Sequence, residues 1–142
     1  MIKSLLPLAA LLLVAPALTL AADRLAPVEG TEVYFIAPAD GDTVETTFTI
    51  RMGLRGMGVA PAGVDVGNTG HHHLLVNTPL DELDLGAGLP FSEGTRHFGG
   101  GQTEASLQLP AGEHTLQLLF MDYRHLSFDP PVVSDVITIT VE

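Results

Sequence analysis

The feature that most constrains the fold is a series of short apolar segments that alternate with glycine- and proline-rich turns. Residues 46–54 show the pattern most clearly, because Phe48, Ile50 and Met52 are each separated by one polar residue. Successive side chains of a β-strand point to opposite faces of its sheet, so an apolar residue at every second position indicates one buried face. The segment is therefore predicted to be a half-buried strand.

The chain beyond residue 22 repeats this organisation. Further segments rich in apolar and β-branched residues are predicted to be strands, at residues 32–37, 71–77, 107–109, 115–121 and 132–141. The connections between the strands carry glycine and proline, and three of them are long, at residues 55–69, 97–104 and 122–131. Residues 80–96 show no regular pattern. Short strands at this spacing predict an all-β chain, folded as an immunoglobulin-like Greek-key β-sandwich.

Residues 1–22 have the organisation of a secretory signal peptide. A positive charge lies near the N-terminus, residues 5–18 are almost entirely apolar, and the small residues Ala21 and Ala22 follow. Signal peptidases cleave after small residues of this kind. The apolar stretch is interrupted by prolines and is short for a membrane span. We therefore predict a single mature domain, residues 23–142, that is periplasmic or secreted.

The charge of the mature chain restricts its partners. Cleavage would remove one of the six basic residues and none of the 17 acidic ones, which leaves a net charge of −12. Nucleic acids and anionic membranes bind clustered Lys and Arg, so neither is expected to bind the mature chain. The chain has no cysteine, although an exported compartment would permit disulfides. A metal ion or a periplasmic protein is the expected partner, and the oligomeric state is left open.

Half of the six histidines form one consecutive run, His71-His72-His73, at the start of a predicted strand. Because strand side chains alternate, His71 and His73 share one face while His72 points to the other. Neutral imidazole is the commonest protein ligand of metal ions, so two imidazoles on one face are a natural half of a metal site. His72 is expected to be packed or hydrogen-bonded on the other face.

The predicted topology places further candidate metal ligands near His71 and His73. In an immunoglobulin-like sandwich the three long connections are predicted to lie at one end, where the histidine strand begins. We therefore predict a metal site in which His97 or His125 joins His71 and His73. The same end carries three weaker candidate ligands: Met57, Met121 and Asp122. His114 lies at the opposite end of its strand and is interpreted as structural.

The chain also resembles a known family. The resemblance is carried by residues 56–63, 68–75, 97–104 and 110–118. These stretches are similar to domain-of-unknown-function family 4399, which comprises exported bacterial proteins without a settled function. The resemblance spans nearly all of the mature chain and implies export, a single domain and a loop histidine at the position of His125. A second loop histidine often follows in the family. Here that place falls near Phe128, so this possible ligand is absent.

Three classes of function follow from these patterns. The first is an exported metal-binding protein, with copper favoured over zinc, because imidazole suits both metals and thioethers favour copper. Its affinity is expected to fall as the pH drops through about 6.5, where histidine is protonated. The alternative is a ligandless immunoglobulin-like interaction module, in which the histidines only satisfy buried polar groups. An enzyme that uses the same metal is least favoured, because no activated nucleophile or carboxylate pair is visible.

Overall fold

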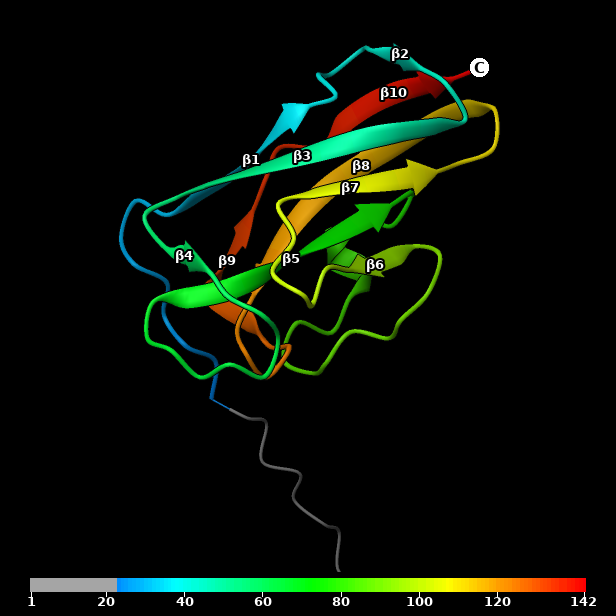
Figure 1. Cartoon of the computed structure of the whole chain (residues 1–142). Coiled ribbons are helices and arrows are strands. Elements are labelled where there is room, and N and C mark those ends of the chain that lie inside the picture. Colours follow the sequence, from blue (N-terminus) through cyan, green and yellow to red (C-terminus); the bar gives the residue numbers. More distant parts are fainter. Residues whose placement is uncertain (1–22) are drawn as a thin grey trace, which may run out of the picture.

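The computed structural model describes residues 23–142, and the predicted signal peptide lies outside the described residues. The elements are, in chain order, β1 (Glu32–Ala37), β2 (Thr43–Val44), β3 (Thr47–Arg55), β4 (Gly58–Val59), β5 (Thr69–Val76), the 3-10 helix η1 (Leu80–Glu82), β6 (Thr95–His97), β7 (Glu104–Gln108), β8 (Gly112–Met121), β9 (Ser127–Val133) and β10 (Ile137–Val141) (Figure 1). No helix within residues 23–142 is long and apolar enough to span a membrane.

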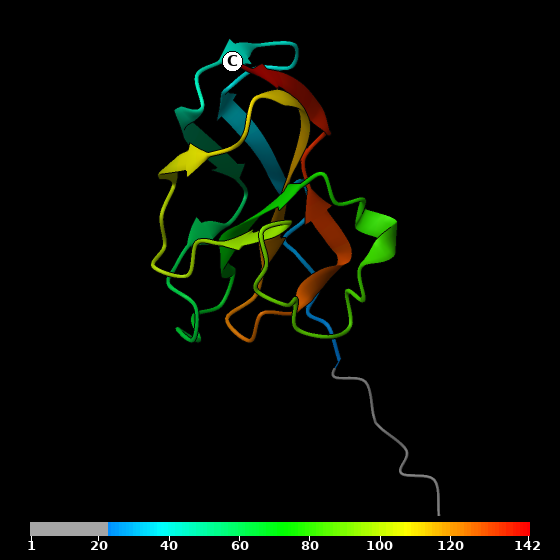
Figure 2. The same cartoon turned by 90° about the vertical axis from the view of Figure 1, so that its right-hand side faces the viewer.

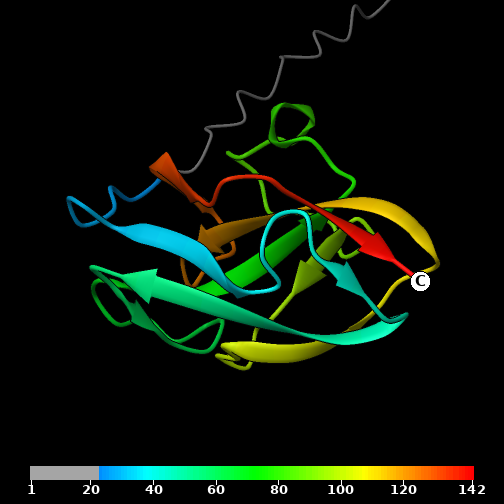
Figure 3. The same cartoon turned by 90° about the horizontal axis from the view of Figure 1, so that it is seen from above.

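The strands form two sheets that pack face to face as a β-sandwich (Figures 1 and 3). The smaller sheet has the order β1-β3-β7. The larger sheet is built on the antiparallel pair β5 and β8; β4 and β6 pair with β5, while β9 and β10 pair with β8, and β2 extends the sheet from β10. The all-β immunoglobulin-like sandwich predicted from the sequence is confirmed.

The hydrophobic core lies between the two sheets. Leu74 and Val76 of β5 point into it, and so do alternate residues of the neighbouring and facing strands: Leu116, Leu118 and Phe120 of β8, and Ile50 and Met52 of β3. All of these side chains are buried. Because strand side chains alternate, the intervening residues of β5 and β8 point to the outer face of the larger sheet. Residues that follow η1 lie over this outer face (Figure 2).

The strand predicted at residues 132–141 is wrong in its extent. The structure has two separate strands there, and β9 already begins at Ser127, inside a segment predicted to be a loop. Pro130 and Pro131 favoured the loop, because proline cannot donate a hydrogen bond to a strand ladder. β9 accommodates both prolines where its register with β8 shifts, between the pairings of Ser127 and Val132.

The segment that follows residue 23 runs along β9. The guanidinium of Arg24 donates to the carbonyl oxygens of Ser127, at 3.0 Å, and of Phe128. The backbone N–H of Asp129 donates to the carbonyl oxygen of Leu25, at 2.9 Å. The beginning of the described chain therefore covers one edge of the larger sheet.

Backbone hydrogen bonds join the three long connections. The N–H of Ala62 donates to the carbonyl oxygen of Gly99, and the N–H of Gly63 donates to that of Tyr123, both at 2.9 Å. The connection at residues 55–69, which contains β4, is thus bonded to each of the other two. The predicted gathering of the three connections is confirmed.

His72 points into the core. It lies opposite Phe120 on β8, and the centroids of the two rings are 5.2 Å apart. Neither ring nitrogen of His72 has a hydrogen-bond partner among the described residues, and burial lowers its pKa to about 4. Of the two predicted roles, packing is therefore correct and hydrogen bonding is not. An unpaired buried polar group costs about 1–3 kcal/mol of stability.

His114 contrasts with His72. Its Nε2–H donates to the carbonyl oxygen of Pro110 at 2.8 Å, and its Nδ1 accepts from the side-chain amide of Asn77 at 2.9 Å. Both ring nitrogens are therefore satisfied, far from the His71 end of β5. The structural interpretation of His114 fits these contacts.

We predict that His72→Leu raises the free energy of unfolding of the metal-free domain by roughly 1 kcal/mol. The melting temperature should then rise by about 3–6 °C. Leucine has a similar volume and leaves no unpaired polar group in the core. His114→Leu is the matched control and should lower the melting temperature, because it removes the hydrogen bonds that His114 makes with the side-chain N–H of Asn77 and the carbonyl oxygen of Pro110. Calorimetry in a chelating buffer measures both, and a fall for His72→Leu would contradict the assignment.

Candidate metal centre

The ladders of β5 determine which side chains face the site. His71 lies opposite Met121 of β8, while His73 lies opposite Leu119 of β8 and, on its other side, opposite His97 of β6. Residues that lie directly opposite one another in an antiparallel pair point to the same side of the sheet. All five therefore face away from the core. They cover the outer face of the larger sheet where β5 begins and β8 ends.

His125 reaches the same place from the connection between β8 and β9. Its φ of 66° lies in the left-handed region, which residues other than glycine seldom adopt. Asp122 stabilises this conformation: its Oδ1 accepts from the backbone N–H groups of Arg124, at 2.7 Å, and of Leu126, at 3.1 Å. The carbonyl oxygen of Asp122 accepts from the N–H of His125 at 3.0 Å. Asp122 thus orients the loop that presents His125.

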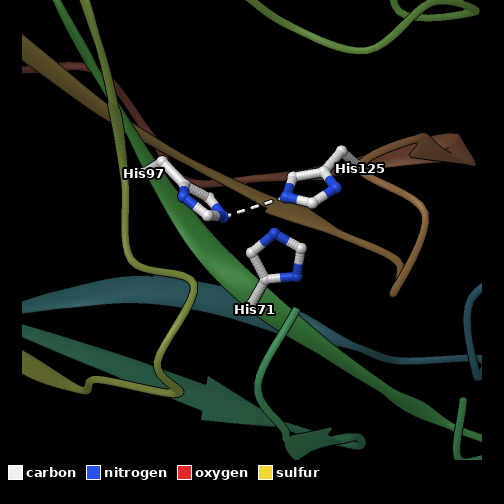
Figure 4. A group of neighbouring side chains, drawn as sticks. All are labelled: His71, His97 and His125. Carbon is white, nitrogen blue, oxygen red and sulfur yellow. Dashed lines mark hydrogen bonds between the residues drawn. The ribbon is translucent and has the colours of Figure 1, made fainter. Parts of the chain in front are cut away.

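The four histidine rings converge. The ring centroid of His71 is 4.8 Å from that of His73, 5.0 Å from His97 and 4.9 Å from His125. The Nε2 atoms of His97 and His125 are 3.0 Å apart. One nitrogen from each of His71, His97 and His125 lies within 4.8 Å of the other two, and Figure 4 shows these three rings directed toward one another. Nitrogens bound to one zinc ion lie about 3.3 Å apart, so small ring movements would close the site.

His73 lies outside this group of three nitrogens. Its ring centroid is 4.9 Å from that of His97 but 6.1 Å from that of His125. The sequence placed His71 and His73 together as the first two ligands, with a loop histidine as the third. The structure instead groups His71 of β5 with His97 of β6 and His125 of the β8–β9 connection, and it places His73 beside them.

His71 and His73, the two buried histidines of the cluster, have ring nitrogens without a hydrogen-bond partner among residues 23–142. The side chain of His71 is 0% exposed, and neither of its ring nitrogens is hydrogen-bonded to any residue between 23 and 142. The Nδ1 of His73 is also unpaired within that range. A neutral imidazole carries one N–H donor and one lone pair, and the lone pair is what a metal ion binds. The cluster is therefore buried, polar and incompletely satisfied by the protein.

Burial keeps these imidazoles neutral. It lowers the pKa of His71 to about 4, where the nearby His125 and His97 lower it further and Asp122 opposes them. The pKa of His73 falls to about 2, mainly through burial and then through His71. Burial, followed by His125, also lowers the pKa of His97. Metal ions bind the neutral ring, so these lowered pKa values keep His71 and His73 in the form that binds a metal ion.

Two residues that the sequence did not indicate shape the solvent side of the cluster. His97 and His125 are half-buried, and Phe91, which is 73% exposed, has its ring centroid 5.0 Å from that of His97. A Cβ at Gly99 would lie 2.1 Å from Cε1 of His97, so only glycine leaves room for this ring. Phe91 belongs to the segment without a pattern, and Gly99 resembled an ordinary turn residue.

The three weaker candidates differ in position. Both carboxylate oxygens of Asp122 are engaged, because Oδ2 accepts from Nε and Nη2 of Arg124, at 2.9 and 2.7 Å, while Oδ1 holds the loop. Met57 packs against the hydrophobic core. Met121 is fully buried and shares the outer face with His71. Met121 is therefore the weaker candidate that the fold places beside the histidines.

The chain is similar to a known family and to parts of solved structures. Residues 50–142 match the family described as "Domain of unknown function (DUF4399)". No curated relative matches significantly. An endo-beta-1,4-mannanase from Thermotoga petrophila is 24% identical, with a TM-score of 0.44 over 79% of this chain and 20% of that chain. Fibronectin(III)-like modules of CbhA from Clostridium thermocellum are 11% identical, with a TM-score of 0.40 over 78% of this chain and 45% of that one. The chain thus spans less than half the length of either.

We predict that the metal-free domain loses stability as the pH falls from 6.5 toward 5. In the unfolded chain His71, His72 and His73 take up protons near pH 6.5, whereas in the folded chain their lowered pKa values keep them neutral. The unfolded state then binds more protons, so each group reduces the free energy of unfolding by up to about 1.4 kcal/mol per pH unit in this window. The effect fades above pH 6.5, as the histidines of the unfolded chain also become neutral.

Urea unfolding at several pH values between 7.5 and 5 measures this slope. Carboxylates titrate mainly below this window, so they contribute little. His72→Leu serves as the control. It should reduce the slope of the free energy of unfolding against pH by the contribution of one histidine. A stability that does not change between pH 6.5 and 5 would show that the histidines are not buried in neutral form.

Proposed function

Because the chain belongs to the DUF4399 family, whose description assigns no function, we propose a function from the site itself: an exported protein that binds copper or zinc at the histidine cluster, with copper favoured. The observation that carries the proposal is the approach of three imidazole nitrogens, from His71, His97 and His125, to within 4.8 Å of one another. Such a set is suited to holding an ion. The proposal includes no chemical reaction.

Each imidazole in the proposed site comes from a different part of the fold. His71 is held by the β5–β8 ladder, His97 ends β6, and His125 projects from the loop that Asp122 orients. His73 lies beside the three as a further donor. An ion bound here would accept the imidazole lone pair of His71, whose ring nitrogens have no hydrogen-bond partner among residues 23–142.

The preference for copper rests on the ligand types and on export. Imidazole suits both copper and zinc, and a thioether favours copper. The signal-peptide pattern of residues 1–22 supports a periplasmic or secreted location, where such a protein would meet copper or zinc from outside the cell.

The rival view is a ligandless interaction module whose histidines hold the loops together. One hydrogen bond favours it, because His97 and His125 already contact each other through their Nε2 atoms at 3.0 Å. However, the connections are joined by the backbone bonds of Ala62 and Gly63, which need no histidine. A scaffold role also leaves His71 without a partner inside residues 23–142. The metal view accounts for more of the cluster.

We predict one tight site for copper or zinc per chain, measured by titration calorimetry on residues 23–142 without a histidine tag. His71→Ala, His97→Ala and His125→Ala should each weaken binding by about 100-fold or more, and His73→Ala by less. Loss of one ligand from a three-imidazole set removes a large share of the binding free energy. Gly99→Ala should also weaken binding, since its Cβ would displace the His97 ring.

His114→Ala is the control for these variants, because its ring lies at the other end of the fold and contacts Pro110 and Asn77. The His114→Ala variant should bind the metal ion with the same affinity as the unchanged protein. If no version binds tightly, and the substitutions in the cluster only lower the melting temperature, the scaffold view is correct. Weak uptake at many sites that ignores every substitution would indicate attraction to an acidic surface alone.

A separate prediction concerns export. N-terminal sequencing of the protein from its native host should find Asp23 as the first residue, because cleavage is expected after Ala22. Recovery of the protein in the periplasmic or extracellular fraction should accompany this result. A protein that retains Met1 would contradict the signal-peptide assignment while leaving the metal site testable.

A further inference from the structure

Within residues 23–142, the candidate metal centre has no negatively charged ligand. The group of His71, His97 and His125 consists of imidazoles, which bind a metal ion through the lone pair of the neutral ring, and His73 lies beside it. Asp122 is close enough to act on His71 through its charge, but both of its oxygens are occupied. Arg124 contacts it at 2.7 Å and offsets its charge. Among residues 23–142, the site therefore supplies an ion with donors but with no unpaired carboxylate to compensate its charge.

This lack of charge discriminates between ions. The free energy required to move an ion from water into a protein interior rises with the square of its charge, so a divalent ion requires about four times as much as a monovalent one of similar size. His71 is 0% and His73 is 3% exposed, so the inner side of the site is closed to water. A neutral, buried set of donors favours a monovalent ion.

Met121 adds a soft ligand to the same place. It lies directly opposite His71 in the β5–β8 ladder, on the outer face of the sheet, and its side chain is fully buried. Cβ atoms of such cross-strand pairs are about 4.5–5.5 Å apart. Its sulfur is thus within reach of an ion held by His71. Thioether sulfur binds the soft ion Cu(I) in preference to harder ions.

We propose, on the basis of the metal site argued above, that its resident ion is monovalent copper and that the thioether of Met121 is one of its ligands. Three imidazoles and one thioether give a neutral, four-donor set. Cu(I) suits this set in charge and in softness, whereas Zn(II) would be buried as an uncompensated dication. Met121 is therefore a determinant of metal specificity at a histidine site.

The test compares ions of different charge on residues 23–142. Cu(I) affinity is measured without oxygen by competition with a chromogenic Cu(I) chelator, Ag(I) serves as a monovalent soft ion that undergoes no redox change, and Zn(II) is measured by calorimetry. We expect one Cu(I) or one Ag(I) per chain, each bound at least about 100-fold more tightly than Zn(II). Zn(II) binding as tight as that of Cu(I) would overturn the proposal.

Met121→Leu tests the ligand itself, and Met57→Leu is the matched control, because Met57 packs against the core instead. Leucine replaces methionine with little change in volume, so both variants should fold. Met121→Leu should weaken Cu(I) binding by about tenfold or more and change Zn(II) binding by less than about threefold. Equal Cu(I) affinities for the two variants would exclude Met121 as a ligand.

The outcomes also separate this inference from the proposed function. Tight binding of Zn(II) that equals or exceeds that of Cu(I), lost in His71→Ala, would retain a histidine metal site and refute its monovalent character. Failure of all three ions to bind in a one-to-one ratio would refute both.

Discussion

The pairing of β5 with β8 is the constraint on which the rest of the structure depends. In this one register Leu74 lies opposite Leu118 and faces the core, while His71 lies opposite Met121 and faces outward. A shift by one residue would exchange the two faces, because the side-chain period of a strand is two. Gly70 permits the close approach at the end of the ladder, since a Cβ there would lie 2.4 Å from the carbonyl oxygen of Met121. Core packing thus enforces the burial of polar rings that would otherwise prefer water.

The sequence predicted the fold well where alternation was clean. The pattern at residues 46–54 became β3, and the strand at 115–121 became β8, which begins earlier, at Gly112. The error at β9 arose because proline is read as a strand breaker, although an interrupted edge ladder accommodates it. The short strands β4 and β6 were missed, because two or three residues carry no detectable period.

The site was predicted only in part, for a related reason. Strand alternation and loop topology sufficed to place four histidines together, since both are properties of the backbone. The exact grouping depends on side-chain geometry: His73 lies outside the closest group, and Asp122 became a support for the loop. The role of Asp122 could have been recognised from the sequence, because an Asp that accepts from N–H groups two and four residues later is ordinary turn chemistry. The role of Gly99 could not have been recognised, because it depends on where the His97 ring lies.

The prolines of β9 and the segment at Arg24 have a consequence for association between copies of the chain. A free sheet edge offers N–H and C=O groups on which a strand from another molecule can add. On β9, Pro130 and Pro131 have no N–H to offer, and Arg24 and Leu25 already hydrogen-bond along the same strand. This side of the larger sheet is therefore closed to extension by a second molecule, and the residues that close it lie directly after the expected cleavage point. Removal of the signal peptide at Asp23 would leave this protection intact, whereas trimming only a few residues further would expose the edge.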